Sequence, residues 1–374
     1  MTQNERIILT LLVTQGALTK RQIEAHSGLA WATVSKLMTR LEDLAYVVRE
    51  GLSPDNSGGK NAYLFNVSGS FPLSLGIDIE YQTTEMIVIN LKDEILARTS
   101  FPTDPNTDET SFFSALVGQI QEFMTTFAVP WAGIHGVGIG MPGWLFGQKA
   151  VDFSKMTDLV CAALAKPVTV VNNIRAYVAS VLRRQDTPAH FMLVTIRTGI
   201  GVGIVLNGQQ FSGENDLAGS IGHIRFRPTR QIQCRCGEYG CLESYANYSA
   251  LAQAAVSALG LPDPDERGAV QHLFELVSVG DAQAREVLHN FALDLAIGIA
   301  SMIVALNIKT VYLASDFGPH GQLLGDELKI ITTEKVLHTI EFSILYDQLV
   351  EERYLFGAAH LVLNSFCDFT KNGV

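Results

Sequence analysis

The sequence predicts a small, mainly α-helical N-terminal domain followed by a larger α/β body in two lobes. At 374 residues the chain is too long for one ordinary core, since domains contain roughly 150 residues each. Helical periodicity dominates residues 1–67, whereas apolar strands alternate with glycine turns and helices from residue 73 onward. We therefore expect a domain at 1–67, a first lobe at 68–185 and a second lobe at 186–374, with the last helix returning to the first lobe.

The first two helices are expected within residues 4–28. "NERIILTLLVTQG" has apolar residues at helical spacing and predicts a helix that ends at Gly16. In "LTKRQIEAHSGL", Thr19 and Gln22 have the spacing of a capping box, and Gly28 provides a turn. Two short helices separated by a tight turn are therefore predicted.

A third helix and a hairpin complete the predicted N-terminal domain. "WATVSKLMTRLEDLAYV" carries an apolar stripe with polar residues on its other faces. "YVVRE" and "NAYLFNV" read as short strands around the turn-rich "GLSPDNSGGK". Together these elements predict a winged helix-turn-helix domain.

A winged helix-turn-helix domain suggests DNA binding, because a recognition helix can enter the major groove while a cap and a wing contact phosphates. The expected groove readers are Trp31, Thr33, Ser35 and Lys36, and the expected backbone contacts are Thr19, Lys20, Arg21, Arg40 and Lys60. A three-helix module for protein interaction is the alternative.

Charge limits how such a domain could hold DNA. Residues 1–67 carry a net charge of +1 and the remainder carries −12, within a total of −11. One weakly basic module would bind DNA poorly, so we expect a dimer that binds a palindromic operator in double-stranded DNA.

Composition also restricts the compartment. Hydrophobic residues make up 47% of the chain and charged residues 17%, which is typical of a well-packed soluble protein. We expect no segment that spans a membrane and no signal peptide, and therefore a cytoplasmic protein. Five cysteines in a reducing compartment do not predict a disulfide framework.

The body begins with two apolar strands joined by a polar turn in "LSLGIDIEYQTTEMIVINLKDEILAR". A helix in "SFFSALVGQIQEFMTTF" follows, and then strands, glycine turns and helices alternate through residue 213. The glycines of "RTGIGVGIVLNG" could bring backbone N–H groups against a phosphate, or could simply form a tight turn.

Four candidate metal ligands lie close together in the second lobe. His223, Cys234, Cys236 and Cys241 offer one imidazole and three thiolates, the complement of a closed tetrahedral zinc site. A strained disulfide or idle buried thiols are the alternatives. A DNA-binding finger is disfavoured because a second histidine and a basic recognition helix are absent.

The winged helix followed in order by "GID", "GIGMPG", "TGIGVG", "SIGH" and "CRCGEYGCLES" resembles the ROK family of repressors, open reading frames and sugar kinases. This resemblance covers nearly the whole chain. It implies an actin-like body of the sugar kinase/Hsp70 type, with a sugar held between the lobes, and a homodimer or homotetramer. It also implies that the zinc is structural.

The resemblance further implies effector contacts from Gly143, Asn172, Asn173 and Glu243. For Glu243 alone, a solvated carboxylate at a helix start is the alternative. The glutamate of the family's E-x-G-H motif is Ser220 here, and its loss would weaken a polyol by about 1.5 to 3 kcal/mol.

Three departures from the family's kinases predict that this protein is not an enzyme. The phosphate loop D-x-G-G-T reads D-I-E-Y-Q here, so Glu80 stands where a glycine would admit phosphate. The catalytic base position is Asn173, an amide with no useful proton affinity. Ser315 and Asp316 replace the glycine pair that passes the adenosine.

We therefore expect a DNA-binding transcriptional regulator, a repressor rather than an activator, that responds to a small carbohydrate or a derivative. An active ATP-dependent sugar kinase with a DNA-binding arm is one alternative. A regulator controlled by protein docking is another, favoured by the change at Ser220.

Overall fold

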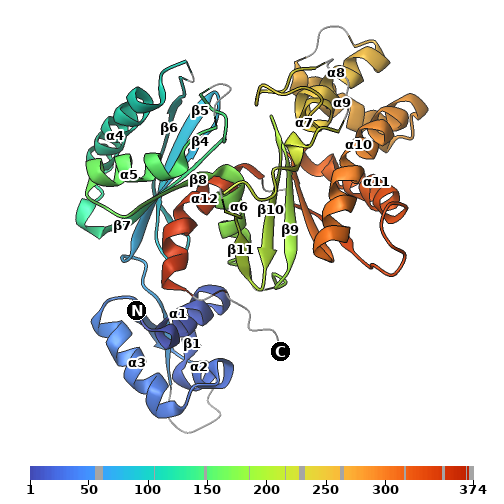
Figure 1. Ribbon diagram of the computed structural model, residues 1–374. Helices are drawn as coiled ribbons and strands as arrows, with labels where there is room; N and C mark the ends of the chain where they lie inside the picture. Colours follow the sequence, from blue (N-terminus) through green and yellow to red (C-terminus); the bar gives the residue numbers. More distant parts are fainter. Residues whose placement is uncertain are drawn as a thin grey trace. The chain divides into compact units, whose positions relative to one another are not determined.

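The computed structural model describes residues 1–54, 62–104, 106–146, 150–184, 186–214, 216–226, 232–261, 265–315, 317–347, 350–367 and 369 (Figure 1). The chain divides into two compact units, each with its own sheet and core. The first unit comprises Met1–Phe146, Ala150–Thr187 and Arg353–Thr370, and the second comprises Gly147–Lys149, Pro188–Glu352 and Lys371–Val374.

The N-terminal part of the first unit is a three-helix module with a small sheet. Its elements are α1 (Gln3–Gln15), β1 (Leu18–Thr19), α2 (Lys20–Ser27), α3 (Trp31–Asp43), β2 (Val47–Leu52) and β3 (Tyr63–Val67). The strands are ordered β1-β3-β2. Gly16 ends α1, and the predicted capping box of Thr19 and Gln22 is confirmed at the start of α2.

The remainder of the first unit is an α/β layer structure. Its elements are β4 (Leu73–Ile79), β5 (Thr83–Ile89), β6 (Ile95–Pro102), α4 (Glu109–Thr126), η1 (Trp131–Gly133), β7 (Ile134–Met141), α5 (Phe153–Leu164), β8 (Val168–Asn172), α6 (Asn173–Val181), α12 (Val350–Leu363) and η4 (Asn364–Phe366). The strands are ordered β6-β5-β4-β7-β8, with β4 antiparallel to β5 and parallel to β7.

The two faces of this sheet are buried against different partners. Met86 and Val88 of β5 belong to a core shared with α4 and α5. Ile87 and Ile89, which alternate with them, belong to a core shared with α12 and with the N-terminal module. Since side chains alternate across a strand, a single strand contributes to both cores. The N-terminal module therefore shares a hydrophobic core with the body.

The second unit has a five-stranded sheet and a helical layer. Its elements are β9 (Phe191–Ile196), β10 (Ile200–Leu206), β11 (Gln209–Phe211), η2 (Ile221–His223), α7 (Glu243–Ala246), α8 (Tyr248–Leu259), α9 (Glu266–Ser278), α10 (Ala282–Leu306), β12 (Thr310–Ser315), η3 (Gly318–His320), α11 (Gly321–Thr333) and β13 (Ser343–Asp347). The strands are ordered β11-β10-β9-β12-β13.

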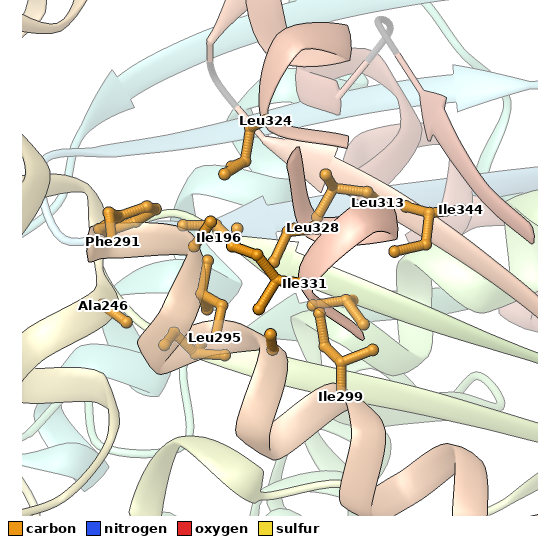
Figure 2. Packing of buried hydrophobic residues seen from close by; sticks show 14 of the residues in the cluster. Ile196, Ala246, Phe291, Leu295, Ile299, Leu313, Leu324, Leu328, Ile331 and Ile344 are labelled. Carbon is orange, nitrogen blue, oxygen red and sulfur yellow. The ribbon is translucent and has the colours of Figure 1, made fainter. Parts of the chain in front are cut away.

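The core of the second unit lies between its sheet and its long helices. Figure 2 shows Leu295 and Ile299 of α10 packed together with side chains from α11 and from strands β9, β12 and β13. The α/β body predicted from the alternation of strands and helices is confirmed.

One helix departs from the expectation that no segment could span a membrane. By length and composition α10 passes that test, with a mean hydropathy of 1.8 over its most apolar window. However, 56% of this window is buried inside the protein, and residues along the whole helix belong to the core of the second unit. We therefore interpret α10 as a core helix, which satisfies the same criterion as a membrane span.

Candidate functional site

The N-terminal end of α3 presents an exposed aromatic and basic surface. Trp31 opens the helix with 47% of its surface exposed, and the Arg21 guanidinium lies 5.9 Å from the centre of its ring. Lys36 is exposed one turn further along, whereas Thr33 and Ser35 are half-buried. A guanidinium and an ammonium beside the first turns of a helix match the arrangement that reads DNA in helix-turn-helix domains.

Two other residues of this surface have partners within the domain. The Thr19 hydroxyl accepts the backbone N–H of Gln22 at 3.2 Å, so this side chain is largely occupied by the helix cap. Arg40 forms an ion pair with the buried Glu5 at 3.2 Å. The sequence did not predict that pair, because Glu5 lies on another helix, 35 positions away.

Of the remaining two candidates, Lys20 lies beside strand β3. The Lys20 ammonium lies 5.2 Å from the centre of the Phe65 ring in β3. Lys60 is outside the described residues. The assignment of all nine residues to DNA contacts stays a prediction.

Three of the four predicted effector residues come together in the first unit. The Asn172 side-chain oxygen caps α6 by accepting the N–H of Ile174 at 3.0 Å. A side chain at Gly143 would begin 3.4 Å from the Asn172 amide nitrogen, so the glycine leaves this amide accessible. The Asn173 amide donates to a Glu80 carboxylate oxygen at 3.1 Å. Glu80 and Asn173, which the resemblance aligns with a phosphate-loop glycine and with the catalytic base of the kinases, are thus hydrogen-bonded to each other.

The fourth predicted effector residue, Glu243, lies in the second unit and is 9% exposed. One carboxylate oxygen accepts the backbone N–H of Ile200 at 3.0 Å, in the glycine-rich loop. A Cβ on Gly199 would lie 2.5 Å from the same oxygen, so only glycine permits this close approach. The Glu243 carboxylate therefore fixes the backbone of the glycine-rich loop. Its assignment as an effector contact stays a prediction.

Ser220, at the position of the family's E-x-G-H glutamate, uses its hydroxyl locally. It donates to the carbonyl oxygen of Leu217 at 2.8 Å, at the start of the short helix η2. A serine cannot reach as far as a glutamate, so no carboxylate is offered from this position.

An aromatic ring, that of Tyr346, packs against the loop that follows β12. The Tyr346 hydroxyl donates to the carbonyl oxygen of Gly318 at 2.7 Å, and Ser315 lies 3.4 Å from the same hydroxyl. A Cβ on Gly321 would lie 2.0 Å from the Tyr346 ring, which means that the ring packs directly on the glycine backbone. Asp316, the other residue expected to differ from the kinases here, is outside the described residues.

The four candidate metal ligands are brought together by a tight knuckle. Their ligand atoms, from His223, Cys234, Cys236 and Cys241, lie within 4.8 Å of one another. The Cys234 N–H donates to the carbonyl oxygen of Glu238 at 2.8 Å, and Gly237 has a φ of 89°, which a side chain would disfavour.

Two of the ligand separations are those expected around a tetrahedral zinc ion. Zinc bonds of about 2.3 Å to sulfur imply sulfur–sulfur separations of about 3.7 Å. The Cys236 and Cys241 sulfurs are 3.7 Å apart, and the Cys234 sulfur is 3.6 Å from Nδ1 of His223. Burial raises the pKa of Cys241 to about 11 and also raises that of Cys234. A bound cation would be needed to hold these thiols as thiolates. The cluster could therefore hold a metal ion.

Comparisons with known proteins agree on one family. The model of the ROK family matches residues 74–365. The chain is 22% identical to the xylose repressor of Bacillus spizizenii, over 98% of this chain and 97% of that protein. A solved ROK family transcriptional regulator, a homologue of the Escherichia coli Mlc protein, aligns with a TM-score of 0.78 and 21% identity, over 97% of this chain and 96% of the other.

A solved kinase aligns with a smaller share of the chain. A ROK family glucokinase from Streptomyces griseus, solved with glucose and a nucleotide analogue, aligns with a TM-score of 0.61 and 23% identity. The alignment covers 77% of this chain and 98% of the glucokinase.

Proposed function

This chain belongs to the ROK family, and on that premise we propose that it is a transcriptional repressor whose binding to operator DNA is controlled by a sugar or a sugar derivative. The observation that carries the proposal is the extent of the similarity. Similarity to the repressor and to the solved regulator extends through the N-terminal module, whereas the kinase covers little more than the body.

We propose that DNA is read by the first turns of α3. Trp31 and Lys36 are exposed there, and Arg21 of α2 lies beside Trp31. Two copies of the chain would present two such surfaces to a palindromic operator, which would supply the affinity that one weakly basic domain lacks. The protein would act in the cytoplasm, where the DNA is.

We propose that Gly143, Asn172, Asn173 and Glu243 are effector contacts. Amides that can both donate and accept are suited to sugar hydroxyls. The absence of a carboxylate at Ser220 favours an effector that differs from a simple hexose at the position that the family's glutamate would contact.

We propose that phosphotransfer has been lost. Asn173 cannot accept the proton of a sugar hydroxyl, and it is hydrogen-bonded to Glu80, whose negative charge would repel a nucleotide phosphate. In the second unit, the Tyr346 ring and the Ser315 hydroxyl occupy the loop where the family's kinases pass the adenosine.

We propose that His223, Cys234, Cys236 and Cys241 hold one structural zinc ion per chain. The zinc would fix the knuckle that precedes Glu243 and would take no part in chemistry. Native mass spectrometry should find one zinc per chain in the wild-type protein and none in Cys241→Ser, whereas Cys161→Ser should retain the metal.

The experiment that tests the repressor assignment is genome-wide mapping of the DNA that the protein binds, followed by binding measurements on the recovered operator. Arg21→Ala and Lys36→Ala should each weaken binding by about 5- to 100-fold. Arg98→Ala, an exposed change in β6 of the body, should leave binding unaltered. If no specific sites were recovered, or if all three variants bound alike, the assignment of this surface would be wrong.

The effector is tested on the same operator. Sugars and phosphosugars would be screened by thermal shift, and those that raise the melting temperature would be added to the operator complex. At least one should change operator affinity, and Asn172→Ala should abolish its effect. If no compound altered the complex, control by a carbohydrate would be excluded for the compounds tested.

A further inference from the structure

The turn between β5 and β6 is bonded to the N-terminal module. Lys92 forms an ion pair with Glu50 of β2, and Glu50 also accepts the Asn66 amide at 3.0 Å. The Asn90 amide donates to the carbonyl oxygen of Gly69 at 2.7 Å, in the segment that connects the module to the body. One turn of the body therefore holds both the wing strands and the connecting segment.

The opposite side of the same turn is bonded to two helices of the body. An Asp93 carboxylate oxygen accepts from Arg183, which follows α6, at 3.1 Å and lies 2.8 Å from Nε2 of His360 in α12. The Arg183 guanidinium also donates to the carbonyl oxygen of Leu91 at 3.0 Å and to Asn364 at 3.3 Å. We refer to Arg183, Asp93 and His360 as the joint.

Two of the three side chains of the joint are removed from solvent, whereas the Asp93 side chain is 39% exposed. The Arg183 and His360 side chains are 5% and 4% exposed. A guanidinium with several fixed acceptors in a buried setting has little freedom to change geometry, and removing its carboxylate leaves donors unpaired. The turn is therefore held in one position by its polar contacts.

Apolar contacts continue from the joint into the N-terminal module. The Tyr46 ring lies 5.5 Å from the rings of both Phe71 and Phe366. Ile8 and Leu12 of α1 belong to the same hydrophobic cluster as Leu363 at the end of α12. The module thus shares its core with the end of a body helix.

The joint is also connected to the proposed effector residues. α6 begins at Asn173 and is 9 residues long, and Arg183 lies two positions beyond its end. α12 packs against the same helix so closely that a Cβ on Gly357 would lie 2.0 Å from the carbonyl oxygen of Ala176. A displacement at the start of α6 would reach the joint through one short, rigid element.

We propose that the joint fixes the orientation of the DNA-binding module on the body, so that the body sets the direction in which α3 faces DNA. The module then does not reorient independently of the body when it binds its half-site. The part of this inference that concerns DNA rests on the proposed function, whereas the mechanical part does not.

The mechanical part is tested by nitrogen-15 relaxation on the deuterated full-length protein. In the wild type, amides of α1–α3 should have the same rotational correlation time as amides of β4–β7. In Asp93→Gly the apolar contacts of the module remain, so its overall correlation time should be unchanged, while relaxation dispersion on the millisecond timescale should appear in amides of α1–α3. Asp93 has a φ of 61°, which glycine adopts without strain, so this variant removes the contacts and leaves the turn intact.

Matched variants separate the joint from a general disturbance. Asp93→Asn keeps an acceptor oxygen and tolerates the same backbone conformation, and should behave as the wild type. Arg98→Ala removes an exposed ion pair with Glu85 on the same strand pair and should also behave as the wild type. Arg183→Lys replaces the guanidinium, which donates to three acceptors, with an ammonium that cannot reach all of them. It provides a second disrupting variant if Asp93→Gly does not fold.

Two results would overturn the proposal: a wild-type module that already tumbles independently, or amides of α1–α3 that show no added relaxation dispersion in any folded disrupting variant. The DNA readout is separate. Wild-type affinity should fall at least tenfold when two base pairs, about 70° of helical rotation, are inserted between the operator half-sites. Asp93→Gly should change less than threefold. If neither protein bound any operator, the proposed function would fail while the relaxation result would still decide the joint.

Discussion

His360 is a buried titratable group whose protonation opposes folding. Burial lowers the pKa of His360 to about 4, and the positive charges of Arg183 and Arg353 act in the same direction, whereas Asp93 opposes them. The unfolded chain takes up a proton near the ordinary value of 6.5, and the folded chain does not. The free energy of unfolding should therefore be fully retained above pH 6.5 and should decrease by up to about 3 kcal/mol between pH 6.5 and pH 4.

Urea unfolding followed by tryptophan fluorescence measures this effect, because the fluorophores all lie in the first unit. They are Trp31, Trp131 and Trp144. His360→Gln should remove most of the pH dependence in this window. Burial alone would raise the pKa of Asp93, but His360 and Arg183 together lower it below 3.8, so its contribution is lost only at more acidic pH. Identical pH profiles for the variant and the wild type would contradict the assignment.

Glu243 gives a second prediction at the residue scale. Glu243→Ala leaves the N–H of Ile200 without its acceptor in a buried loop, which should destabilise the second unit by about 1 to 3 kcal/mol. Glu243→Gln keeps an acceptor oxygen and should cost less. Hydrogen exchange of the Ile200 amide should accelerate in the alanine variant and change little in the glutamine variant. Equal protection in both would show that the carboxylate does not hold the loop.

Individual residues show what the sequence could predict. The metal ligands were identifiable because three cysteines and a histidine lie within 19 positions, and the structure brings their atoms together. The contact of Glu243 with Ile200 spans 43 positions and has no local signature. The pair of Glu80 and Asn173 spans 93 positions. The sequence therefore predicted a changed phosphate loop and a changed catalytic base, but not that Glu80 and Asn173 are hydrogen-bonded to each other.

At the scale of elements, α12 packs on a glycine track formed by Gly76 of β4 and by Gly136 and Gly138 of β7. A Cβ on Gly138 of β7 would lie 1.8 Å from the carbonyl oxygen of Ala358, which is closer than any side chain can approach. Gly138→Ala should therefore lower the free energy of unfolding of the first unit by about 1 to 3 kcal/mol or more, because α12 must move away from the sheet. Urea unfolding by tryptophan fluorescence measures the change.

Gly118→Ala is the matched control. Gly118 is exposed within α4 and a Cβ there would meet nothing within 4 Å, so alanine should stabilise the helix by about 0.5 to 1 kcal/mol. Destabilisation of similar size in both variants would show that the glycine track is not the cause.

Elements with local signals were predictable from the sequence, and pairings between distant elements were not. The ends of α1 and α2 followed from Gly16, Gly28 and the Thr19 capping box. The order of the strands depends on contacts such as β9 with β12, whose residues are about 120 positions apart. The sequence does not present α10 as one continuous apolar run, because polar residues interrupt it, although its average hydropathy is that of a membrane span.

At the scale of the whole molecule, the body should no longer bind ATP in a productive way. No phosphorylation of D-glucose, D-xylose or N-acetylglucosamine by ATP is expected. The double variant Glu80→Gly with Asn173→Asp should also remain inactive, because the Tyr346 ring and the Ser315 hydroxyl still occupy the other loop. A coupled assay for ADP measures turnover, with a sugar kinase as the positive control. Turnover by the wild-type protein would restore the kinase alternative.

The first unit is assembled from both ends of the chain, and this affects its synthesis. Residues 1–187 leave the ribosome without α12, whose Leu355 and Leu363 complete the core shared by the sheet and the N-terminal module. The second unit is nearly contiguous and can fold first. At about 5 to 20 residues per second, the earlier segment waits roughly 10 to 40 s for its last helix. The nascent chain should therefore expose an apolar sheet face to chaperones during this interval. A premature stop codon near residue 350 should release a folded second unit joined to a first unit whose core is incomplete.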